Sequence, residues 1–340
     1  MNLVELHQVA QALVPAGKGI LAADESTGTI RKRLASIDVE STLQMRRDYR
    51  EMLFTTAGME DFISGVILFD ETLRQDARDG TPLRQILAEK GVIPGIKVDT
   101  GAKDLAGFPG EKVTEGLDGL GKRLEEYREL GAKFAKWRAV IHIGPQIPTR
   151  FCLLANAHAL ARYAALCQQV GLVPIVEPEV MMTGDHSIER CQDVTTHTLS
   201  IVFSQLIEHR VALEGILLKP NMVLSGKDCP QQASPKEVAE ATVQCFRRVV
   251  PAAVPGIVFL SGGQTPEQAT ANLSAMNALG EQPWQLSFSY GRALQQPALH
   301  VWKGESAKVP AAQKAFYVRA KLNGAARYGK YTPEMESVAA

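Results

Sequence analysis

Charged residues stand inside or directly after several apolar segments of this 340-residue chain, and they are the residues whose types could do chemistry. Lys136 and Arg138 are two positions apart, and so are Glu177 and Glu179. Side chains two apart on a strand point to the same face of the sheet. Lysine and glutamate are rarely buried unless they are paired, so we expect these opposite charges to converge at one place.

Lys219 stands out because it follows the apolar run 215–218, precedes Pro220 and has no acidic residue next to it in the sequence. On apolar walls near Lys136 and Arg138, burial and like charge would both disfavour the protonated amine. An uncharged amine can attack a carbonyl carbon and form a Schiff base. The alternative that stays open is a lysine held in a structural ion pair.

Consecutive glycines before a helix favour a phosphate site. Ser261, Gly262 and Gly263 come just before a helix that we expect to begin near Pro266. Backbone N–H groups in such a loop can converge on an anion, and the helix dipole favours negative charge there. Arg292, which follows the last apolar segment, can add a planar set of donors. We therefore expect one phosphate group to bind here.

A second group of hydroxyl and cationic residues comprises Ser26, Thr29, Arg33 and Lys97. Two separated phosphate sites would imply a substrate phosphorylated at both ends. The run 31–33 is entirely basic, so a solvated helix face without function is the alternative for its members.

Eight short apolar segments, each followed by small or charged residues, are the predicted strands that position these groups. They cover residues 19–23, 63–69, 95–98, 135–141, 173–177, 215–219, 257–261 and 286–290, and helices are predicted at 41–57, 81–90, 120–130, 149–170, 187–209, 234–250 and 265–279. This alternation predicts an α/β protein with a parallel sheet, and eight strands favour closure into a (β/α)8 TIM barrel. Functional groups of such barrels lie at the carboxyl ends of the strands. An open doubly wound sheet is the alternative.

No linker rich in proline, glycine or serine divides the chain, so we predict one barrel domain over residues 1–340. An N-terminal helix is expected over about residues 1–15, and a loosely held tail, able to act as a mobile arm over the active site, over about residues 325–340. The chain begins without a signal-peptide pattern and lacks a long apolar run, so we expect no membrane contact.

Composition excludes some classes of function. Thirty-seven basic residues balance thirty-seven acidic ones, which argues against a nucleic-acid binder that works through net charge. The five cysteines (Cys152, Cys167, Cys191, Cys229 and Cys245) are widely spaced and form no CxxC motif. We therefore expect a reduced, cytoplasmic protein without a disulfide framework.

Seven segments carry a resemblance to a known family. GILAADESTGTI, GIKVDTG, KWRAVI, PIVEPEV, LEGILLKPNMV, FLSGGQTPEQAT and SFSYGRALQ, in this order, resemble class I fructose-1,6-bisphosphate aldolase over roughly residues 10–330. The resemblance implies a (β/α)8 barrel, usually a homotetramer, that needs no cofactor and no metal. It also implies the reversible cleavage of fructose 1,6-bisphosphate, in glycolysis and gluconeogenesis, into dihydroxyacetone phosphate and glyceraldehyde 3-phosphate.

Carried over residue by residue, the resemblance implies five catalytic groups. Lys219 matches the Schiff-base lysine, and Glu177 matches the general acid/base with Glu179 as its hydrogen-bonding companion. Asp24 matches the carboxylate that holds the substrate hydroxyl near the bond that breaks. Lys136 matches the cation beside the lysine.

The resemblance also implies two groups of phosphate contacts. The phosphate beside the ketone would be bound by Ser261, Gly262, Gly263, Ser289 and Arg292. The other phosphate would be bound by Ser26, Thr29, Arg33 and Lys97, with Arg138 beside it.

Two positions depart from the family pattern. Thr29 stands where a serine is common, and it keeps the hydroxyl. The chain ends in SVAA, whereas the animal enzymes end in a tyrosine that assists proton transfer on the carbanion carbon. We expect Tyr328, Tyr331 or a water molecule to substitute, or that step to be slow.

Three other functions remain as alternatives. A metal-dependent aldolase would need histidine ligands, but no HxH or HExxH occurs, although His186 and His197 could meet in space. A non-catalytic phosphosugar-binding protein could use the same barrel. A transaldolase-like Schiff-base enzyme would need only one phosphate site, so the presence of both Lys97 and Arg292 argues against it.

Overall fold

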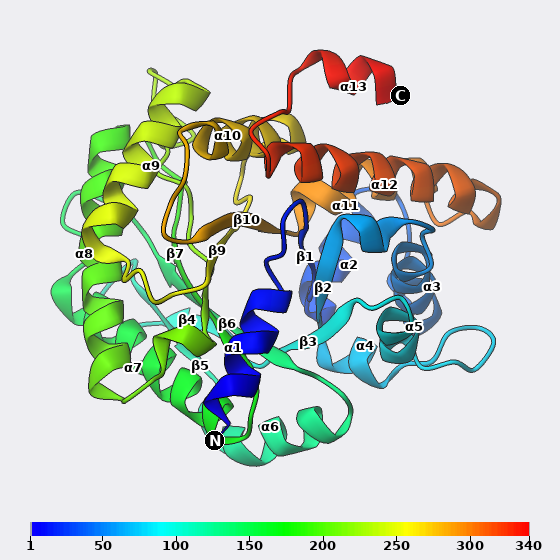
Figure 1. Ribbon diagram of the computed structural model, residues 1–340, viewed down its shortest axis with the longest axis horizontal. Coiled ribbons are helices and arrows are strands. Elements are labelled where there is room, and N and C mark those ends of the chain that lie inside the picture. Colours follow the sequence, from blue (N-terminus) through cyan, green and yellow to red (C-terminus); the bar gives the residue numbers. More distant parts are fainter. Residues whose placement is uncertain (1, 340) are drawn as a thin grey trace.

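A computed structural model describes residues 2–339, and eight parallel strands among them form a closed barrel (Figure 1). The strands are β1 (Gly19–Ala23), β2 (Ile63–Leu68), β3 (Ile93–Lys97), β6 (Phe134–Ile141), β7 (Val173–Val180), β8 (Leu217–Leu218), β9 (Gly256–Phe259) and β10 (Gln285–Tyr290). Their order around the barrel is β1-β10-β9-β8-β7-β6-β3-β2. The predicted TIM barrel is confirmed, and the open sheet is excluded because each of these eight strands pairs with two neighbours, so the sheet has no edge strand.

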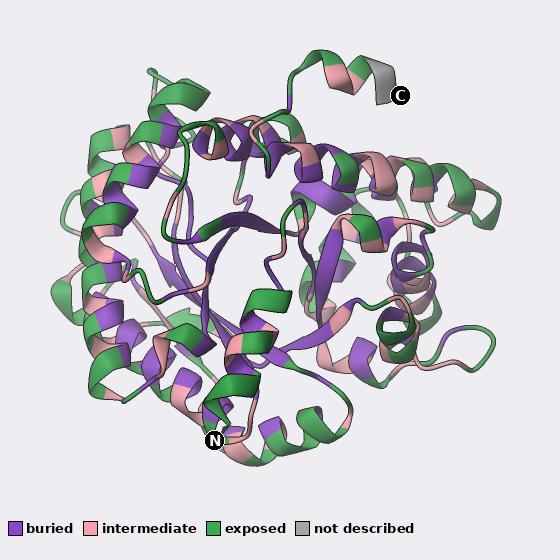
Figure 2. Ribbon diagram, in the orientation of Figure 1, coloured by how far each residue is buried: buried purple, intermediate pink, exposed green. Residues whose placement is uncertain are grey.

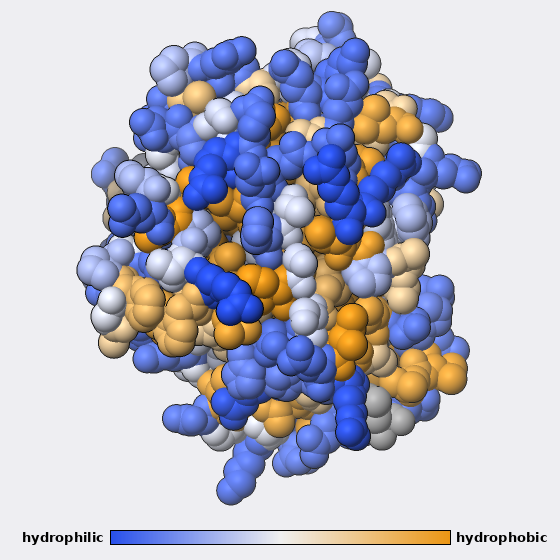
Figure 3. Space-filling model, turned by 90° about the vertical axis from the view of Figure 1, so that its left-hand side faces the viewer, coloured by the Kyte–Doolittle hydropathy of each residue, from blue (hydrophilic) through white to orange (hydrophobic). Residues whose placement is uncertain are grey.

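The helices form an outer layer around the strands. They are α2 (Thr27–Ala35), α3 (Leu43–Phe54), α4 (Asp70–Arg74), α5 (Leu83–Glu89), α6 (Leu120–Glu129), α7 (Arg150–Gln169), α8 (Ile188–Glu208), α9 (Pro235–Val249), α10 (Pro266–Ala278), α11 (Arg292–Trp302) and α12 (Val309–Ala326). Figure 2 shows the strands buried and the outward helix faces exposed. On the side formed by α8 and α9, apolar side chains lie scattered among hydrophilic ones (Figure 3).

Two helix starts illustrate why the sequence folds this way locally. Ser234 precedes Pro235, and its side chain accepts the N–H of Glu237 while the Glu237 carboxylate accepts the N–H of Ser234. Thr265 and Gln268 make the same reciprocal pair at the start of α10. Each capping box satisfies N–H groups that have no partner within the helix. The start of α10 is thereby fixed next to the predicted phosphate loop.

Two of the strand boundaries that differ from the predicted ones bear on the site. β8 is only two residues long, so Lys219 lies directly after the strand, where its N–H donates to the Val176 carbonyl at 2.8 Å. β7 continues to Val180, which places Glu177 and Glu179 inside the strand. The antiparallel pair β4 (Gly101–Asp104) and β5 (Lys112–Glu115) was not predicted, because it is short and most of its residues lack the apolar alternation of a buried strand.

Helix α1 (Leu3–Ala12) closes the amino-terminal end of the barrel, where the sequence predicted a helix over about residues 1–15. Leu6, Ala10 and Leu13 pack in one buried cluster with Phe134, the first residue of β6. A Cβ atom at Gly95 would lie 2.3 Å from the Phe134 ring. The glycine therefore makes room for a phenylalanine that fills this end of the barrel, so functional groups can gather only at the other end.

The segment after α12 leads to helix α13 (Glu334–Ala339). Glu336 accepts the Tyr331 hydroxyl at 2.8 Å and is paired with Arg319 of α12. The predicted tail therefore begins inside α12 and has ordered contacts up to Glu336, while its action as a mobile arm stays a prediction. Ala340, the last residue of the SVAA ending, lies outside the described residues.

Two expectations about the whole chain can be compared with residues 2–339. All five cysteines are free thiols there, and four of them are buried. None of the helices in this range combines the length and the apolar character that crossing a membrane requires.

Arg327 ties the end of α12 to the closed end of the barrel. Its guanidinium donates to the carbonyls of Lys18 at 3.0 Å, Pro15 at 3.0 Å and Val14 at 3.2 Å, and also to that of Leu286 in β10. The side chain is buried, and burial lowers the pKa of Arg327 to about 10. One cation therefore satisfies carbonyls from both ends of the chain.

Replacing this guanidinium should destabilise the fold. Arg327→Met leaves the Val14 carbonyl without a donor among the described residues and takes one donor from the carbonyls of Pro15, Lys18 and Leu286, which keep other partners. An unpaired buried group costs about 1–3 kcal/mol, so we expect the free energy of unfolding to fall by about 1–3 kcal/mol. The measurement is the urea midpoint followed by circular dichroism. Arg162→Met, at an exposed position of α7, is the matched control and should keep the wild-type midpoint. Equal midpoints for the two variants would contradict this account of Arg327.

Candidate active site

A pocket of about 490 Å³ lies at the carboxyl ends of the strands, and its lining is dominated by charged and hydroxyl side chains. Fourteen of the fifteen predicted site residues line it: Asp24, Ser26, Thr29, Arg33, Lys97, Lys136, Arg138, Glu177, Glu179, Lys219, Ser261, Gly262, Ser289 and Arg292. Gly263 lies outside this lining, and its N–H points to Met182 Sδ at 3.1 Å.

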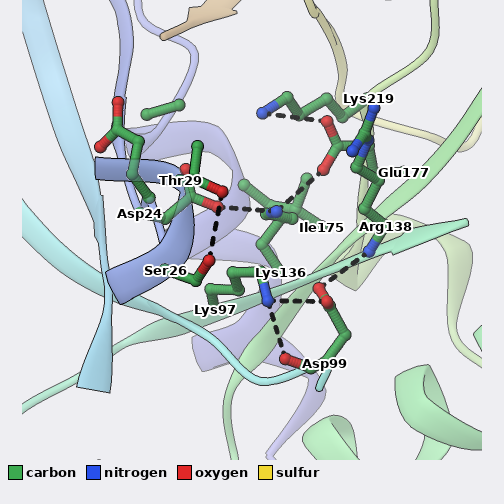
Figure 4. Close-up of polar contacts among 12 residues, drawn as sticks. Asp24, Ser26, Thr29, Lys97, Asp99, Lys136, Arg138, Ile175, Glu177 and Lys219 are labelled. Carbon is green, nitrogen blue, oxygen red and sulfur yellow. Dashed lines mark hydrogen bonds and ion pairs between the residues drawn. The ribbon is translucent and has the colours of Figure 1, made fainter. Parts of the chain in front are cut away.

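Four charges of alternating sign, those of the buried Lys219, Glu177 and Lys136 and of the half-buried Asp24, form the centre of the pocket (Figure 4). Lys219 Nζ lies 3.2 Å from Glu177 Oε1, and Glu177 Oε2 lies 3.2 Å from Lys136 Nζ. Lys136 Nζ is in turn 2.7 Å from Asp24 Oδ2. The four groups come from different strands or strand ends, and their charges cancel.

The Lys136–Asp24 pair is held in its charged form. Burial alone would lower the pKa of Lys136, but the nearby carboxylates of Asp24 and Glu177 outweigh it and raise that pKa above the usual value. Burial alone would raise the pKa of Asp24, but Lys136 and Lys219 bring it below the usual range. Lys136 is thus a fixed cation that orients two carboxylates.

The surroundings of Lys219 differ from the predicted ones in one respect. We expected the cations of Lys136 and Arg138 to dominate them, but the amine is in contact with the Glu177 carboxylate. Lys219 does form an ion pair, as the alternative of a structural lysine required. The pair lines a pocket, however, so both groups are accessible to a ligand. A carboxylate at this distance can accept a proton from the amine and return it to a bound substrate.

Glu179 lies on the same side of β7 as Glu177, since both line the pocket. In the structure its carboxylate accepts the Arg138 Nε–H instead of contacting Glu177. Burial alone would lower the pKa of Arg138, but Glu179 and Glu177 raise it above its usual value. Arg138 and Glu179 are therefore a charged pair beside the central chain.

One rim of the pocket matches the predicted phosphate loop. Arg292 Nη2 donates to the Gly262 carbonyl, and Gly262 has a φ of 56°, a left-handed conformation that favours glycine. Burial, helped by the nearby Arg33, lowers the pKa of Arg292 from its usual value. Ser289 Oγ is buried and has no hydrogen-bond partner among the described residues. Unused donors and a partly desolvated cation favour an anion here.

A second rim of the pocket carries Lys97, Ser26 and Thr29 (Figure 4). Lys97 Nζ lies 2.7 Å from Asp99 Oδ1, and the hydroxyls of Ser26 and Thr29 are 3.2 Å apart. Ser26 is the N-cap of α2, and its side chain makes no capping hydrogen bond. The N–H groups of this helix start are thus available to an anion together with the two hydroxyls.

Arg33 lines the pocket and also contacts a buried carboxylate. Its Nη1 donates to the Glu25 carboxylate, and its Nη2 lies 3.8 Å from the position that a Cβ of Gly291 would occupy. Gly291 directly precedes Arg292, so Arg33 approaches the rim of Ser289 and Arg292.

Sequence reasoning missed Glu25 and Asp99 as site residues. Asp99 is two positions after Lys97, and side chains two apart on a strand share a face, so this spacing could have identified Asp99. Glu25 directly follows Asp24, so the alternation of side chains along a strand predicts that the two point to opposite faces. β1 ends at Ala23, however, so this alternation does not apply to Asp24 and Glu25.

Two of the expected substitutes for the absent tyrosine can be located. Tyr328 packs against Gly17, which precedes β1, so it lies at the closed end of the barrel and cannot reach this pocket. Tyr331 lines a neighbouring groove of about 320 Å³ together with Met182, the residue that contacts Gly263.

The histidine alternative can also be compared with the structure. Ser187 caps α8, and His197 lies inside that helix, about 15 Å along its axis from Ser187, the residue that follows His186. These two residues therefore cannot share a metal ion. Within residues 2–339, no three His, Cys, Asp or Glu residues gather as a possible ligand set.

The arrangement has definite chemical capacities. An amine beside a carboxylate can form a Schiff base and exchange protons with a bound carbonyl compound. Two cationic rims of one pocket can hold both ends of a sugar bisphosphate. A barrel with these capacities is a lyase that can cleave carbon–carbon bonds of phosphorylated sugars.

Comparisons with known proteins agree. The family model for class-I fructose-bisphosphate aldolase matches residues 5–340. A probable fructose-bisphosphate aldolase class 1 of Xanthomonas campestris is 60% identical over 332 residues, which cover 97% of this chain and 99% of the relative. Fructose-bisphosphate aldolase 5, cytosolic, of Arabidopsis thaliana is 56% identical over 329 residues, covering 96% of this chain and 92% of the relative.

A solved structure of fructose-bisphosphate aldolase from Plasmodium falciparum, in complex with TRAP and a small-molecule inhibitor, has a TM-score of 0.96 and 51% identity and covers 97% of this chain and 96% of its own. The chain belongs to the class I fructose-bisphosphate aldolase family. It catalyses the reversible, glycolytic cleavage of fructose 1,6-bisphosphate into dihydroxyacetone phosphate and glyceraldehyde 3-phosphate through a lysine Schiff base.

The lowered pKa of Asp24 leads to a prediction about stability and pH. Its folded pKa lies below the unfolded value of about 3.9, so its contribution to stability is present above that pH and is lost as the pH falls toward the folded pKa. Asp24→Asn should therefore lower the urea midpoint at pH 6 and make a smaller difference at pH 3. Asp118→Asn, at an exposed loop position, is the control and should show no such change. A difference between wild type and Asp24→Asn that stays constant with pH would contradict the charged pair.

Proposed function

We propose that Lys219 is the amine that forms the Schiff base and that Glu177 moves the protons. The observation that carries this proposal is the 3.2 Å separation of Lys219 Nζ and Glu177 Oε1 inside a pocket with two cationic rims. Both side chains are 5% exposed, so bulk water competes little for the amine or the carboxylate.

The proposed cleavage starts with attack of Lys219 Nζ on the C2 ketone of fructose 1,6-bisphosphate. Glu177 moves two protons in turn from the Lys219 ammonium nitrogen to the C2 oxygen, one before the attack and one after it, so the oxygen leaves as water and Glu177 is again a carboxylate. The resulting iminium withdraws electrons from the C3–C4 bond while Glu177 takes the C4 hydroxyl proton. The bond breaks to glyceraldehyde 3-phosphate and an enamine. The enamine is protonated at C3, and water then releases dihydroxyacetone phosphate from Lys219.

Asp24 and Lys136 support this step in different ways. Asp24 is an ionised carboxylate at the pocket wall and can accept a hydrogen bond from the sugar hydroxyl near the scissile bond. Lys136 contacts both Asp24 and Glu177, so it fixes their separation.

The two rims orient the substrate. We assign the phosphate beside the ketone to Ser261, Gly262, Gly263, Ser289 and Arg292, and the other phosphate to Ser26, Thr29 and Lys97 with Arg138 beside it. Orientation of this kind can supply up to about 7–11 kcal/mol of the lowering of the barrier, and an acid/base group adds about 10²–10⁴-fold in rate. The covalent step and the two anchors together therefore account for most of the expected acceleration.

We further propose that the protein works in the cytoplasm as a homotetramer. Free cysteines, four of them buried, suit a reducing compartment, and the relatives from Arabidopsis thaliana are named cytosolic. Exposed apolar side chains occur on two neighbouring helices, with Phe151 and Leu154 on α7 and Ile207 on α8. Such side chains suit contacts between subunits.

The Schiff base can be tested by chemical trapping. In wild type, borohydride reduction with dihydroxyacetone phosphate should attach the three-carbon phosphate to Lys219, located by peptide mass mapping. Lys219→Met should give no adduct and lose at least 10³-fold in kcat, since the covalent route is closed. Lys236→Met, at an exposed position of α9, is the control and should behave as wild type. An adduct on another lysine would refute the assignment.

The two-rim assignment makes a separate prediction. Lys97→Met removes a contact of the phosphate remote from the ketone, so the KM for fructose 1,6-bisphosphate should rise roughly tenfold, because a charged hydrogen bond contributes about 1.5–3 kcal/mol. The dissociation constant of dihydroxyacetone phosphate, which lacks that phosphate, should stay unchanged. Steady-state kinetics and calorimetry give the two quantities. A parallel loss of affinity for both ligands would contradict the assignment of Lys97.

A further inference from the structure

The thioether of Met182 occupies a backbone donor of the glycine loop after β9. The Gly263 N–H donates to Met182 Sδ at 3.1 Å, and a Cβ atom at Gly263 would lie 3.0 Å from the same sulfur. The Cβ position of Gly262 is 3.6 Å from it. A thioether is only a weak acceptor, so an anion can take this N–H from it. The sulfur and a phosphate oxygen therefore compete for one donor.

The backbone at Met182 is fixed, so only the side chain can move away from the glycine loop. The Met181 N–H donates to the carbonyl of Ile141, the last residue of β6, at 2.8 Å. The Met182 carbonyl accepts the Lys227 N–H at 2.7 Å. These two hydrogen bonds hold the segment after β7 from both sides, and they keep the thioether beside Gly263.

The sulfur can be reached from outside the catalytic pocket. Met182 is absent from the lining of that pocket and instead lines the groove of about 320 Å³ that also contains Tyr331. Its hydrogen bond with Gly263 is exposed. A small solute can therefore approach the sulfur through the groove. Four other methionines are buried and less accessible: Met52, Met59, Met222 and Met276.

Oxidation would strengthen the acceptor at this position. A peroxide transfers one oxygen atom to a thioether: the S–O bond forms as the O–O bond breaks, the sulfur loses two electrons, and the second peroxide oxygen leaves with both hydrogens as water. The product, methionine sulfoxide, is polar, and its oxygen is a much better acceptor for an N–H than sulfur is. The negative end of the S–O dipole would also face an arriving phosphate.

We propose that Met182 is a site of reversible peroxide modification, at which the sulfoxide oxygen keeps the Gly263 N–H and thereby weakens binding of the phosphate next to the ketone. This inference rests on the proposed function, because it uses the assignment of Gly263 to that phosphate. Methionine sulfoxide reductases return the thioether, so the loss of affinity is reversible. A residue outside the pocket lining thus controls substrate affinity through its oxidation state.

The test compares the protein before and after treatment with hydrogen peroxide, with the excess removed by catalase. The readouts are peptide mass mapping, the dihydroxyacetone phosphate concentration that gives half-maximal borohydride trapping at Lys219, and kcat and KM for fructose 1,6-bisphosphate. We expect one added oxygen on Met182, and a roughly tenfold rise in the half-saturating concentration and in KM with kcat little changed, since one hydrogen bond to a charged group is lost. Methionine sulfoxide reductases should restore both values without any substitution.

Two variants separate Met182 from other targets of peroxide. Met182→Leu has a side chain of similar size without sulfur, so its half-saturating concentration and KM should be the same before and after peroxide. Met182→Gln carries a carboxamide oxygen as a permanent acceptor, so it should show the raised values without peroxide.

Two matched controls keep the oxidisable Met182. Met45→Leu replaces a half-buried methionine of α3, and Cys229→Ser replaces the one cysteine that is not buried. Both variants should respond to peroxide as the wild-type protein does.

Each outcome decides. Equal losses of affinity in Met182→Leu and wild type after peroxide would overturn the proposal, and so would an oxygen on Met182 that changes neither value. A fall in kcat alone, or unraised values for Met182→Gln, would also overturn it. Failure of the untreated wild-type protein to trap dihydroxyacetone phosphate at Lys219 would instead contradict the proposed function, so the two failures are distinguishable.

Discussion

The rest of the site depends on one buried cation, Lys136, held between two carboxylates. An ammonium group removed from water is costly unless it is closely paired, and Asp24 and Glu177 supply that pairing. The contact with Asp24 joins β6 to β1, two strands that are not neighbours in the barrel, so it requires the closed sheet. Because Lys136 takes one oxygen of Glu177, the other oxygen faces Lys219. The contacts of Lys136 therefore depend on barrel closure and also fix the position of the Glu177 carboxylate.

Three other cations of the pocket are also each paired with a carboxylate. Lys97 is paired with Asp99, Arg138 with Glu179 and Arg33 with Glu25, each cation with its own largely buried carboxylate. Such pairing offsets part of the positive charge, and the seven cations and four carboxylates that line the pocket leave a net positive charge for two phosphates. The cations are also more exposed than their carboxylate partners, so they present their free donors to the pocket while the acceptors stay in the protein. Phosphate binding then needs little movement of the buried groups.

The features of the fold and the site that the sequence predicted are those encoded by short sequence patterns. The parity of Glu177 and Glu179, and of Lys136 and Arg138, is a property of single strands, and all four side chains do line one pocket. Alternating strands and helices predicted the barrel, because each unit needs only short-range patterns. The partner of Glu179 and the rim that Arg33 joins depend on contacts between distant segments, which no spacing along the chain encodes. The two-residue β8 and the β4–β5 pair were misjudged because they are too short to show a period.

The path of the chain after α12 also limits how the enamine can be protonated. Arg327 fixes the end of α12 at the closed end of the barrel, which keeps Tyr328 far from the pocket. Tyr331 lies on the side of α10, where its backbone N–H donates to Ser274 and its hydroxyl donates to Glu336. Burial and the adjacent Glu336 raise the pKa of Tyr331 above its usual value, which makes its proton harder to give up. With the tail in this position, neither tyrosine is placed to protonate the enamine. A water molecule in the pocket can supply that proton without breaking the contacts of Tyr328 or Tyr331.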